Sequence, residues 1–487
     1  MNPSKERKIW HREGMNLRTH AWHLVGIGSI CLTLILLNTR DGGQPESLEQ
    51  PSEILVKGFK PGASFFTLYY KSDAVGDVQT VKSYGAGGGF VYDVQTHFRL
   101  SAFGQDIEIT MELNAEFDEL FGLSQLRFSM NSGETSITGR GTVKGDQLMI
   151  SVVTGGSEST YTLPYDRDLI IGSVLGSRVT ADNLEPGDVK RLKLFDPLSQ
   201  TVRKIKLTAV GYEEILILDR KVSVLKIEQE TMGVILNGWV TAEGEMVRQE
   251  LGLGLVAQLE PRTAVDYRKR KRTRRVDLIQ ELLVPVSGMP EDYIRRKRLK
   301  YRVINIPTSM RLTSGTHQTW NDQTLSVTRM NKPGYTLFKV SDYPLKSNDL
   351  FAQSEAPGVR AVALEMAGNA ISMEALILRA LEWFDTHIKQ ASVASLPASL
   401  ETLRTRTGDC NEHAFLFAGM LRALGVETEI VTGIAYVPRL KRFGYHAWNE
   451  VKVGELMIPV DPTWQQFPAD ATHIGLVKGG LQAQSSL

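Results

Sequence analysis

The sequence predicts an α+β protein in which an N-terminal transmembrane helix is followed by a large antiparallel β region and then by a mixed C-terminal domain. Three observations predict this order: an apolar run at residues 21–37, short alternating segments over residues 58–266, and helical and strand-like patterns together in residues 350–487. The length of 487 residues is enough for several domains, at roughly 100–200 residues each. A hydrophobic content of 42% and a charged content of 23% are typical of a globular chain.

The apolar run at residues 21–37 (AWHLVGIGSICLTLILL) predicts a membrane anchor, because its 17 residues lie at the short end of what spans a bilayer. Residues 1–20 carry five Lys and Arg side chains, whereas only Arg40 follows the run closely. The positive-inside rule therefore makes residues 1–20 a cytoplasmic tail. No small-x-small cleavage site follows the run, which favours a retained signal anchor over a cleaved signal peptide, the main alternative. We expect a single-pass protein of a bacterial inner membrane whose bulk is periplasmic.

Residues 38–57 are polar with Gly and Pro and are typical of a linker. Residues 58–266 then hold short segments rich in β-branched and aromatic residues, such as FFTLYYK, DIEITMEL and GVILNGWVT, separated by Gly, Asn, Asp and Ser. This pattern predicts a strongly curved antiparallel sheet or open barrel that serves as a scaffold or binding domain. The GAGGG sequence at Gly85–Gly89 has neither the GxGxxG spacing nor a Walker lysine, so we interpret it as a turn.

Two basic clusters mark residues 267–346, which we interpret as a basic linker followed by a small β-rich module. Arg268–Arg275 reads RKRKRTRR, and Arg295–Lys300 reads RRKRLK. Either the clusters form a solvated linker, or they contact an anionic surface of lipid or envelope polymer, where each charge adds up to about 1 kcal/mol. The net charge of the chain is only +1, so we expect no nucleic-acid partner.

The chain has two cysteines, Cys31 and Cys410, and Cys31 lies inside the apolar run. Cys410 therefore has no disulfide partner in the rest of the chain. A lone thiol outside the cytoplasm is exposed to oxidation and mispairing. Cys410 is therefore either buried and inert or retained for its chemistry.

Residues 350–487 begin with helical patterns over Ala370–Gln390 and Ala398–Arg404. A third helix is predicted within Thr407–Gly425 (TGDCNEHAFLFAGMLRALG), where Asp409 and Glu412 have the spacing of a capping box. Cys410 then lies in the first turn of this helix. Unpaired N–H groups and the helix dipole favour an anion there, so we expect the pKa of the thiol to be lowered.

Two strands are predicted after this helix, GYHAWNEVKV at Gly444–Val453 and ELMIPVD at Glu455–Asp461. A hairpin with a two-residue loop at residues 453–454 would pair Lys452 with Glu455 and place His446 opposite Asp461. Opposite side chains share a face of the sheet, so the carboxylate could hold the imidazole. A slip of one residue would move Asp461 to the other face.

A helix-start thiol, an imidazole and an orienting carboxylate are the components of a Cys–His–Asp triad. Cys410, His446 and Asp461 are therefore the candidate catalytic residues. A zinc site built from Cys410, His413, His446 and Asp461 is an open alternative. We expect His473 and His387 to be packing or surface residues.

The blocks GDCNEHA at Gly408–Ala414, GYHAWNEV at Gly444–Val451 and VDPTW at Val460–Trp464 resemble, in this order, three signature blocks of the transglutaminase-like superfamily. The resemblance implies a papain-like α+β fold, with the nucleophile helix packed on an antiparallel sheet. It also implies that Cys410 is the nucleophile, His446 the base and Asp461 the residue that orients the base.

The resemblance further implies acyl transfer from a carboxamide through a thioester. Water as the acceptor would make the protein a cysteine amidase or protease, and a lysine amine would make it a cross-linking acyltransferase. We expect a protein or peptide substrate, such as a component of the cell envelope, and neither a cofactor nor a bound metal. The alternative is a non-catalytic envelope scaffold that retains the site.

Overall fold

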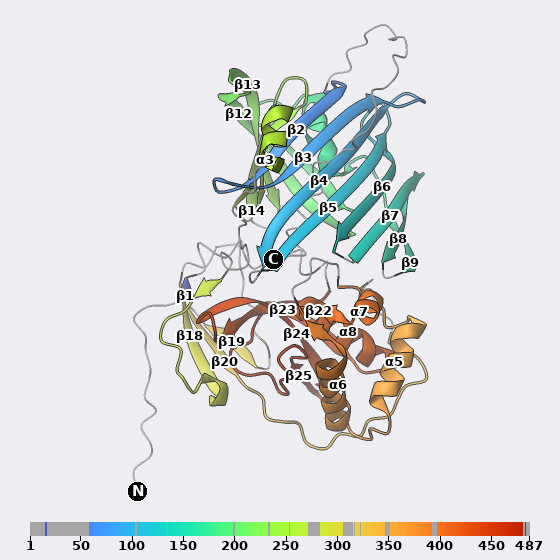
Figure 1. Ribbon diagram of the computed structural model, residues 1–487, viewed down its shortest axis with the longest axis vertical. Helices are drawn as coiled ribbons and strands as arrows, with labels where there is room; N and C mark the ends of the chain where they lie inside the picture. Colours follow the sequence, from blue (N-terminus) through green and yellow to red (C-terminus); the bar gives the residue numbers. More distant parts are fainter. Residues whose placement is uncertain are drawn as a thin grey trace.

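The structure is a computed structural model with a curved β domain above a smaller α+β domain (Figure 1). It describes residues 15–16, 58–102, 105–133, 135–154, 156–197, 200–231, 234–252, 254–270, 283–304, 315, 317–321, 323–345, 351–391, 397–480 and 483. The predicted anchor at residues 21–37 and the predicted linker at residues 38–57 lie outside these ranges. Among the residues that the structure describes, no helix is long and apolar enough to cross a membrane.

The β domain is one 15-stranded sheet within the described residues, ordered β10-β11-β12-β13-β14-β15-β16-β2-β3-β4-β5-β6-β7-β8-β9. Its first half consists of β2 (Gly62–Tyr70), β3 (Asp73–Tyr84), β4 (Phe90–Ala102), β5 (Gln105–Phe117), β6 (Leu123–Ser132), β7 (Thr135–Lys144), β8 (Gln147–Thr154) and β9 (Ser157–Pro164). Its second half consists of β10 (Leu169–Ile170), β11 (Val189–Asp196), β12 (Thr201–Ile217), β13 (Arg220–Thr231), β14 (Val234–Val240), β15 (Met246–Gly252) and β16 (Leu255–Leu259). Apart from the parallel pair β10–β11, neighbouring strands are antiparallel, so the predicted antiparallel region is confirmed.

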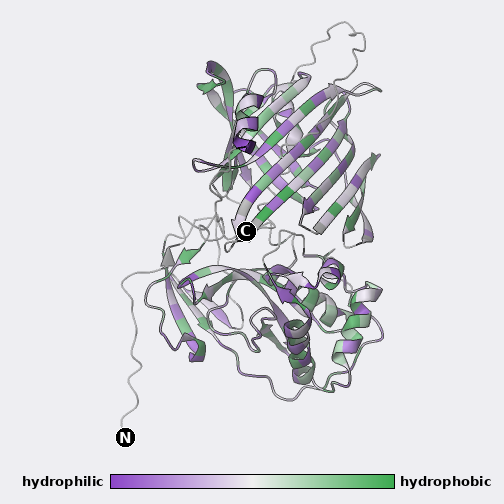
Figure 2. Ribbon diagram, viewed as in Figure 1, coloured by the Kyte–Doolittle hydropathy of each residue, from purple (hydrophilic) through white to green (hydrophobic). Residues whose placement is uncertain are grey.

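Apolar and polar residues alternate along the strands of this sheet, as the colours in Figure 2 show. Successive side chains of a strand point to opposite faces, so this alternation gives the sheet one apolar face. In β8, Leu148, Ile150 and Val152 are buried while the residues between them face outward. A 3-10 turn η2 (Gly172–Val174) and the helix α2 (Leu175–Ala181) pack on the sheet, with Ser177 Oγ 2.6 Å from Tyr92 Oη. The predicted turn at Gly85–Gly89 is confirmed by backbone hydrogen bonds between its ends.

The basic cluster at Arg268–Arg275 starts inside a helix that the sequence did not predict, α3 (Arg262–Arg270). Arg268 forms an ion pair with Glu260, and Lys269 Nζ lies 2.8 Å from Asp77 of β3. These two charges are therefore used to hold α3 on the β domain. Residues 271–275 lie outside the described part of the chain.

The α+β domain contains a five-stranded sheet in the described residues, ordered β17-β24-β23-β26 with β25 paired to β24. Its strands are β17 (Val284–Pro285), β23 (Thr428–Val437), β24 (Arg442–Val453), β25 (Leu456–Val460) and β26 (Ile474–Lys478). One face is covered by α5 (Pro357–Ala367), α6 (Met373–His387), α7 (Ser399–Thr405) and α8 (Cys410–Ala423). Short strands β21 (Lys389–Gln390) and β22 (Thr407–Gly408) lead into α8. The predicted helices over Ala370–Gln390 and Ala398–Arg404 correspond to α6 and α7.

A small sheet packs against the five-stranded sheet. It contains β18 (Arg298–Ile304), β20 (Thr324–Thr328), β19 (Gln318–Asn321) and β1 (Met15–Asn16). The 3-10 turn η3 (Tyr293–Arg295) precedes β18. Its apolar side chains form one core with those of the five-stranded sheet, including Tyr301, Val303, Phe443 and Ile474. Residues 283–328 therefore complete the C-terminal domain from the side. β1 pairs with β18 through Met15 and Val303, whereas the predicted topology separates residues 1–20 from this domain by a membrane.

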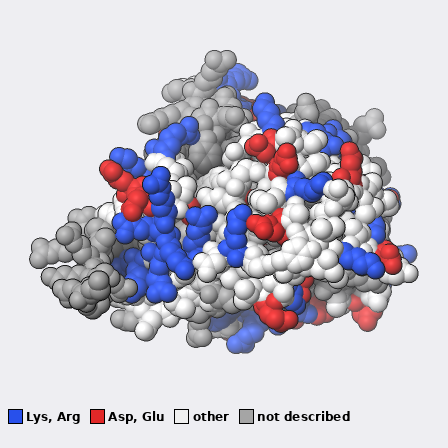
Figure 3. All heavy atoms as spheres, turned by 90° about the horizontal axis from the view of Figure 1, so that it is seen from below, with Lys and Arg blue, Asp and Glu red and all other residues white. Residues whose placement is uncertain are grey.

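The outer face of β18 is basic. Arg298, Lys300 and Arg302 are exposed, and they alternate with the buried residues Leu299, Tyr301 and Val303. Figure 3 shows Lys and Arg side chains gathered on the side of the molecule where β18 lies. The second basic cluster of the sequence, Arg295–Lys300, therefore begins at the end of η3 and continues into the exposed face of β18.

Candidate active site

The candidate site begins at the first turn of α8. Asp409 Oδ1 accepts a hydrogen bond from the Asn411 N–H at 2.9 Å, and Glu412 Oε2 accepts one from the Asp409 N–H at 2.9 Å. The predicted capping box is thus confirmed. Gly425, with φ of +86°, ends the helix as a left-handed residue that favours glycine. This local sequence fixes Cys410 as the first residue of the helix.

Replacing Asp409 with alanine should lower the free energy of unfolding by about 1 kcal/mol, since it removes the helix cap. Asp409→Asn should retain most of the stability, because asparagine caps helices well. Chemical denaturation followed by tryptophan fluorescence would measure both. Equal stability of wild type and Asp409→Ala would show that the cap contributes nothing to folding.

Three contacts hold the start of α8 against β24. Asn449 Nδ2 donates to the Ala414 carbonyl at 2.9 Å, and Tyr445 Oη donates to Asn411 Oδ1 at 2.8 Å. The backbone N–H of Ala447 hydrogen-bonds the Cys410 thiol. Cys410 therefore faces the stretch of β24 that carries His446. Cys410 is half-buried, as are Asn411, Tyr445 and Trp464, so the site reaches the surface between α8 and the strand ends.

His446 is bound to Asp461, as the hairpin argument requires. His446 Nε2 lies 2.8 Å from Asp461 Oδ2, and both side chains are buried. The other carboxylate oxygen of Asp461 accepts the N–H groups of Thr463 and Trp464 at 2.8 and 3.1 Å. The indole of Trp464 stacks on the His446 ring, with centroids 4.1 Å apart. Asp461 thus holds the His446 imidazole at Nε2, and Trp464 covers one face of its ring.

The predicted register of this hairpin was wrong by two residues. Lys452 pairs with Met457, not with Glu455, because the loop is Gly454–Glu455 with Gly454 at φ of +60°. Val460 pairs with Asn449, so Asp461 follows at the level of Trp448. A shift of two residues preserves the face, and Asp461 reaches His446 diagonally across the strands.

The pKa of the Cys410 thiol is raised, opposite to the expectation from the helix start. Burial is the main cause, the Asp409 carboxylate adds to it, and the Ala447 N–H opposes it. The helix dipole is therefore outweighed by desolvation and by nearby negative charge. The resting thiol is protonated, and a base must remove its proton before it attacks.

The pKa of Asp461 is lowered. Its burial acts to raise the pKa, but the charge of His446 and the hydrogen bonds from His446 and His473 outweigh that effect. Asp461 is therefore ionised at neutral pH and can accept hydrogen bonds from both imidazoles.

His473 belongs to this cluster, although we expected it to be a packing or surface residue. It is buried, with Nε2 3.1 Å from Asp461 Oδ2 and Nδ1 3.3 Å from Asp470 Oδ1. Burial alone would lower the pKa of His473, but the hydrogen bonds and charges of Asp461 and Asp470 raise it to about 9. His473 is thus an imidazolium at neutral pH. Its sequence context contains no family block that would have marked it.

His446, Asp461 and His473 are also a group that could hold a metal ion in the described part of the chain, since their donor atoms lie within 4.8 Å of one another. In the structure these donors bond to each other instead, with both Nε2 atoms directed at Asp461 Oδ2. The zinc alternative used Cys410 and His413, and neither belongs to this group. His413 Nδ1 lies 2.5 Å from the Asp409 carbonyl, and burial lowers its pKa.

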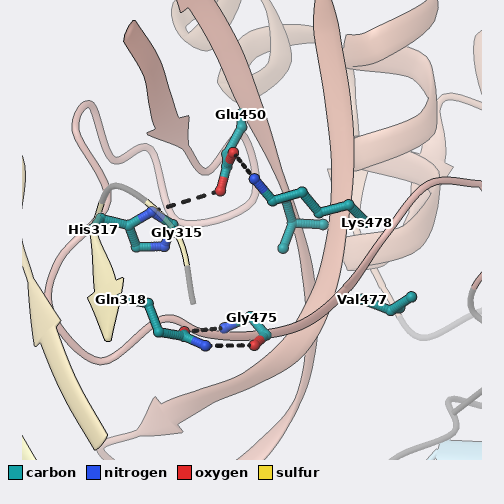
Figure 4. A pocket seen from close by; sticks show the side chains of 8 residues that line it. Gly315, His317, Gln318, Glu450, Gly475, Val477 and Lys478 are labelled. Atoms are coloured by element: carbon teal, nitrogen blue, oxygen red, sulfur yellow. Dashed lines mark hydrogen bonds and ion pairs between the residues drawn. The ribbon is translucent and has the colours of Figure 1, made fainter. Parts of the chain in front are cut away.

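A second polar cluster lies further along β24, at a pocket shown in Figure 4. The buried Glu450 forms an ion pair with Lys478 of β26, and its Oε1 lies 3.6 Å from His317 Nδ1. The Gln318 side chain bonds the N–H and the carbonyl of Gly475, both at 2.9 Å. Burial lowers the pKa of His317, so this histidine is neutral at neutral pH. The cluster joins the small sheet to β24 and β26.

Comparison with known proteins identifies the domain around this site. Residues 360–465 match the model of the transglutaminase-like superfamily, so the resemblance drawn from the three blocks is confirmed. No curated protein matches the sequence.

Three solved structures are similar to parts of the chain. A candidate cysteine protease from Cytophaga hutchinsonii is 16% identical, with a TM-score of 0.25, and the match covers 34% of this chain and 57% of that protein, a little over half its length. A β-barrel-like protein of domain of unknown function DUF1849 from Brucella abortus is 10% identical, with a TM-score of 0.33 and coverage of 41% and 95%. A DUF1089 family protein from Pseudomonas aeruginosa is 10% identical, with a TM-score of 0.23 and coverage of 42% and 95%. All three TM-scores lie below 0.5, so these similarities carry no argument about activity.

Proposed function

We propose that the protein transfers acyl groups from carboxamides through a Cys410–His446–Asp461 triad. The observation that carries the proposal is the buried bond between His446 Nε2 and Asp461 Oδ2 at 2.8 Å, on the strand that faces Cys410. The family match supports cysteine-based acyl transfer or hydrolysis in general.

The proposed reaction has two steps. His446 takes the thiol proton at Nδ1, the nitrogen not bound to Asp461, while Cys410 Sγ attacks the carbonyl carbon of the amide. The same proton passes to the departing amine or ammonia as the C–N bond breaks, which leaves a thioester on Cys410. His446 then takes a proton from the incoming water or amine, which attacks the carbonyl carbon of the thioester. The C–S bond breaks, the acyl group leaves on the acceptor, and the proton passes from His446 to Cys410 Sγ.

The positions of the side chains support these roles. Asp461 is ionised and accepts the Nε2–H of His446, which leaves Nδ1 unprotonated in the neutral ring. The raised pKa of Cys410 makes a base necessary, and a positioned base contributes roughly 10²–10⁴ in rate. The N–H of Cys410 at the helix start is a candidate donor to the developing oxyanion.

We propose a protein or peptide substrate and a location outside the inner membrane, with the bulk in the periplasm. The location rests on residues 1–40, and it requires that β1 does not pair with β18 in the membrane-inserted protein. The exposed basic face of β18 supports contact with an anionic surface. The β domain would then position the substrate or a partner.

An activated ester tests the proposed chemistry without a known substrate. We expect the full chain to form an acyl adduct on Cys410 with p-nitrophenyl acetate, seen by peptide mass mapping, and Cys410→Ser to lose that adduct. Mapping separates Cys410 from Cys31. Adding a primary amine would then show whether water or amine takes the acyl group. Acylation of Cys410 no faster than that of a free thiol would contradict the proposal.

A non-catalytic scaffold that retains the site is the second candidate, and the raised pKa of the half-buried thiol favours it. The same experiment separates the two functions. A scaffold predicts slow acylation that does not depend on His446, whereas the proposed enzyme predicts fast acylation that does.

A further inference from the structure

We infer that His473 is a positioning residue whose positive charge, held by Asp470, sets the pH range in which Cys410 and His446 react. The inference rests on the proposed function and deepens it, since it concerns the regulation of the same site. Its basis is the chain of buried contacts Asp470–His473–Asp461–His446, with distances of 3.3, 3.1 and 2.8 Å.

Two imidazoles share one carboxylate oxygen in this chain. His473 and His446 both approach Asp461 Oδ2, and their ring centroids are 5.6 Å apart. An isolated Asp461 carboxylate would strengthen proton binding at His446. The imidazolium of His473 opposes that effect, because its charge offsets the carboxylate and repels a second proton.

Asp470 keeps the charge on His473. Its Oδ1 also accepts the N–H and the hydroxyl of Thr472, at 2.8 and 2.6 Å, and its Oδ2 accepts the Gln466 amide at 3.1 Å. The carboxylate is therefore fixed, and its pKa is lowered to about 2: burial opposes this shift, and the hydrogen bond from His473 is the largest cause of it. A neutral His473 would leave two buried carboxylates with one fewer counter-charge.

The titratable and charged groups close to His473, or to residues next to it, lie on several elements. They are Asp461 after β25, Asp470 before β26, His446 and Glu450 of β24, Lys478 of β26, His317 before β19, Tyr301 of β18 and Tyr293 of η3. The pKa values of both tyrosines are raised by burial, so they are neutral at neutral pH. Glu450 and Lys478 cancel each other as an ion pair. His473 is thus the charged imidazole of this group, and it lies between the carboxylates of Asp461 and Asp470.

Loss of this charge should shift the pH profile of the site towards alkaline pH. The local potential becomes more negative, so protons bind more tightly to both His446 and Cys410. The midpoint of the profile therefore moves in the same direction whether its acid limb reflects deprotonation of His446 or of Cys410. For charges about 5.6 Å apart at an effective dielectric constant of about 20, the shift is about two pH units.

The test measures alkylation of Cys410 by iodoacetamide against pH in the full chain, resolved from Cys31 by peptide mapping. In His473→Gln the amide can still donate to Asp461, so the variant removes charge and retains a hydrogen bond. We expect its midpoint about two units above wild type, and a shift in the same direction for His473→Asn, which removes the same charge.

His317→Gln is the matched control, since His317 is also a buried histidine beside the sheet but is neutral. Its profile should coincide with that of wild type. An unchanged or acid-shifted midpoint in His473→Gln would overturn the inference, and if that variant does not fold, an unchanged midpoint in His473→Asn would overturn it. The proposed function would fail separately if Cys410 were alkylated equally slowly in wild type and in His446→Ala. In that case the midpoint of Cys410 alkylation would still report the charge of His473.

Discussion

His446→Ala should slow acylation of Cys410 by about 10²–10⁴-fold, because the thiol is protonated at rest and loses its base. The decrease should be largest near neutral pH and should diminish at high pH, where hydroxide ionises the thiol. Stopped-flow release of p-nitrophenol, with adduct mapping on Cys410, measures the rate constant directly.

The control for this prediction is His387→Ala. His387 is exposed at the end of α6, where it stacks on Trp383. Acylation of Cys410 in His387→Ala should therefore proceed within about twofold of the wild-type rate. Asp461→Asn should slow the reaction as well, since an amide can donate to Nε2 and favour the wrong tautomer. Equal rates in wild type and His446→Ala would remove His446 from the mechanism.

Gly419→Ala should destabilise the C-terminal domain by about 2 kcal/mol or more, although alanine normally stabilises the interior of a helix by about 1 kcal/mol. A Cβ atom at Gly419 of α8 would lie 1.9 Å from the Ala352 carbonyl oxygen and 2.9 Å from Ser399 Oγ. The hydroxyl of Ser399 binds this same carbonyl at 2.8 Å, so the contact cannot relax without breaking that bond. Urea unfolding followed by tryptophan fluorescence would measure the loss.

Gly211→Ala in β12 is the matched control, because a Cβ atom there meets nothing within 4 Å. Its stability should stay within about 1 kcal/mol of wild type. Wild-type stability of Gly419→Ala would show that the segment at Ala352 is not packed on α8 as described. Acylation of Cys410 should fall together with stability in Gly419→Ala, since α8 carries the nucleophile.

The parts of the structure that follow from local rules were predictable from the sequence. Alternation predicted the antiparallel β domain, and the spacing of Asp409 and Glu412 predicted the start of α8. The hairpin argument brought His446 and Asp461 together even though its register was two residues off, because only the parity of the loop decides which face a side chain occupies.

The parts that depend on distant contacts were not predictable. His473 has no local pattern, and its role arises because the chain returns to β26 beside Asp461. The pKa of Cys410 was predicted in the wrong direction, since the helix dipole is visible in the sequence and the burial of the thiol is not. The packing of α3 on the sheet likewise depends on the ion pair between Lys269 and Asp77, which lies about 190 residues earlier in the chain.

The position of the small sheet has a practical consequence for protein expression. A fragment limited to the family match at residues 360–465 contains Cys410, His446 and Asp461. It lacks β26, which pairs with β23, and it lacks β18 and β20, whose apolar side chains share a core with Phe443 and Ile434. Such a fragment would expose that apolar surface and aggregate, and its inactivity would reflect cloning boundaries instead of chemistry. Residues 283–480 retain every strand of the five-stranded sheet and the residues around His473.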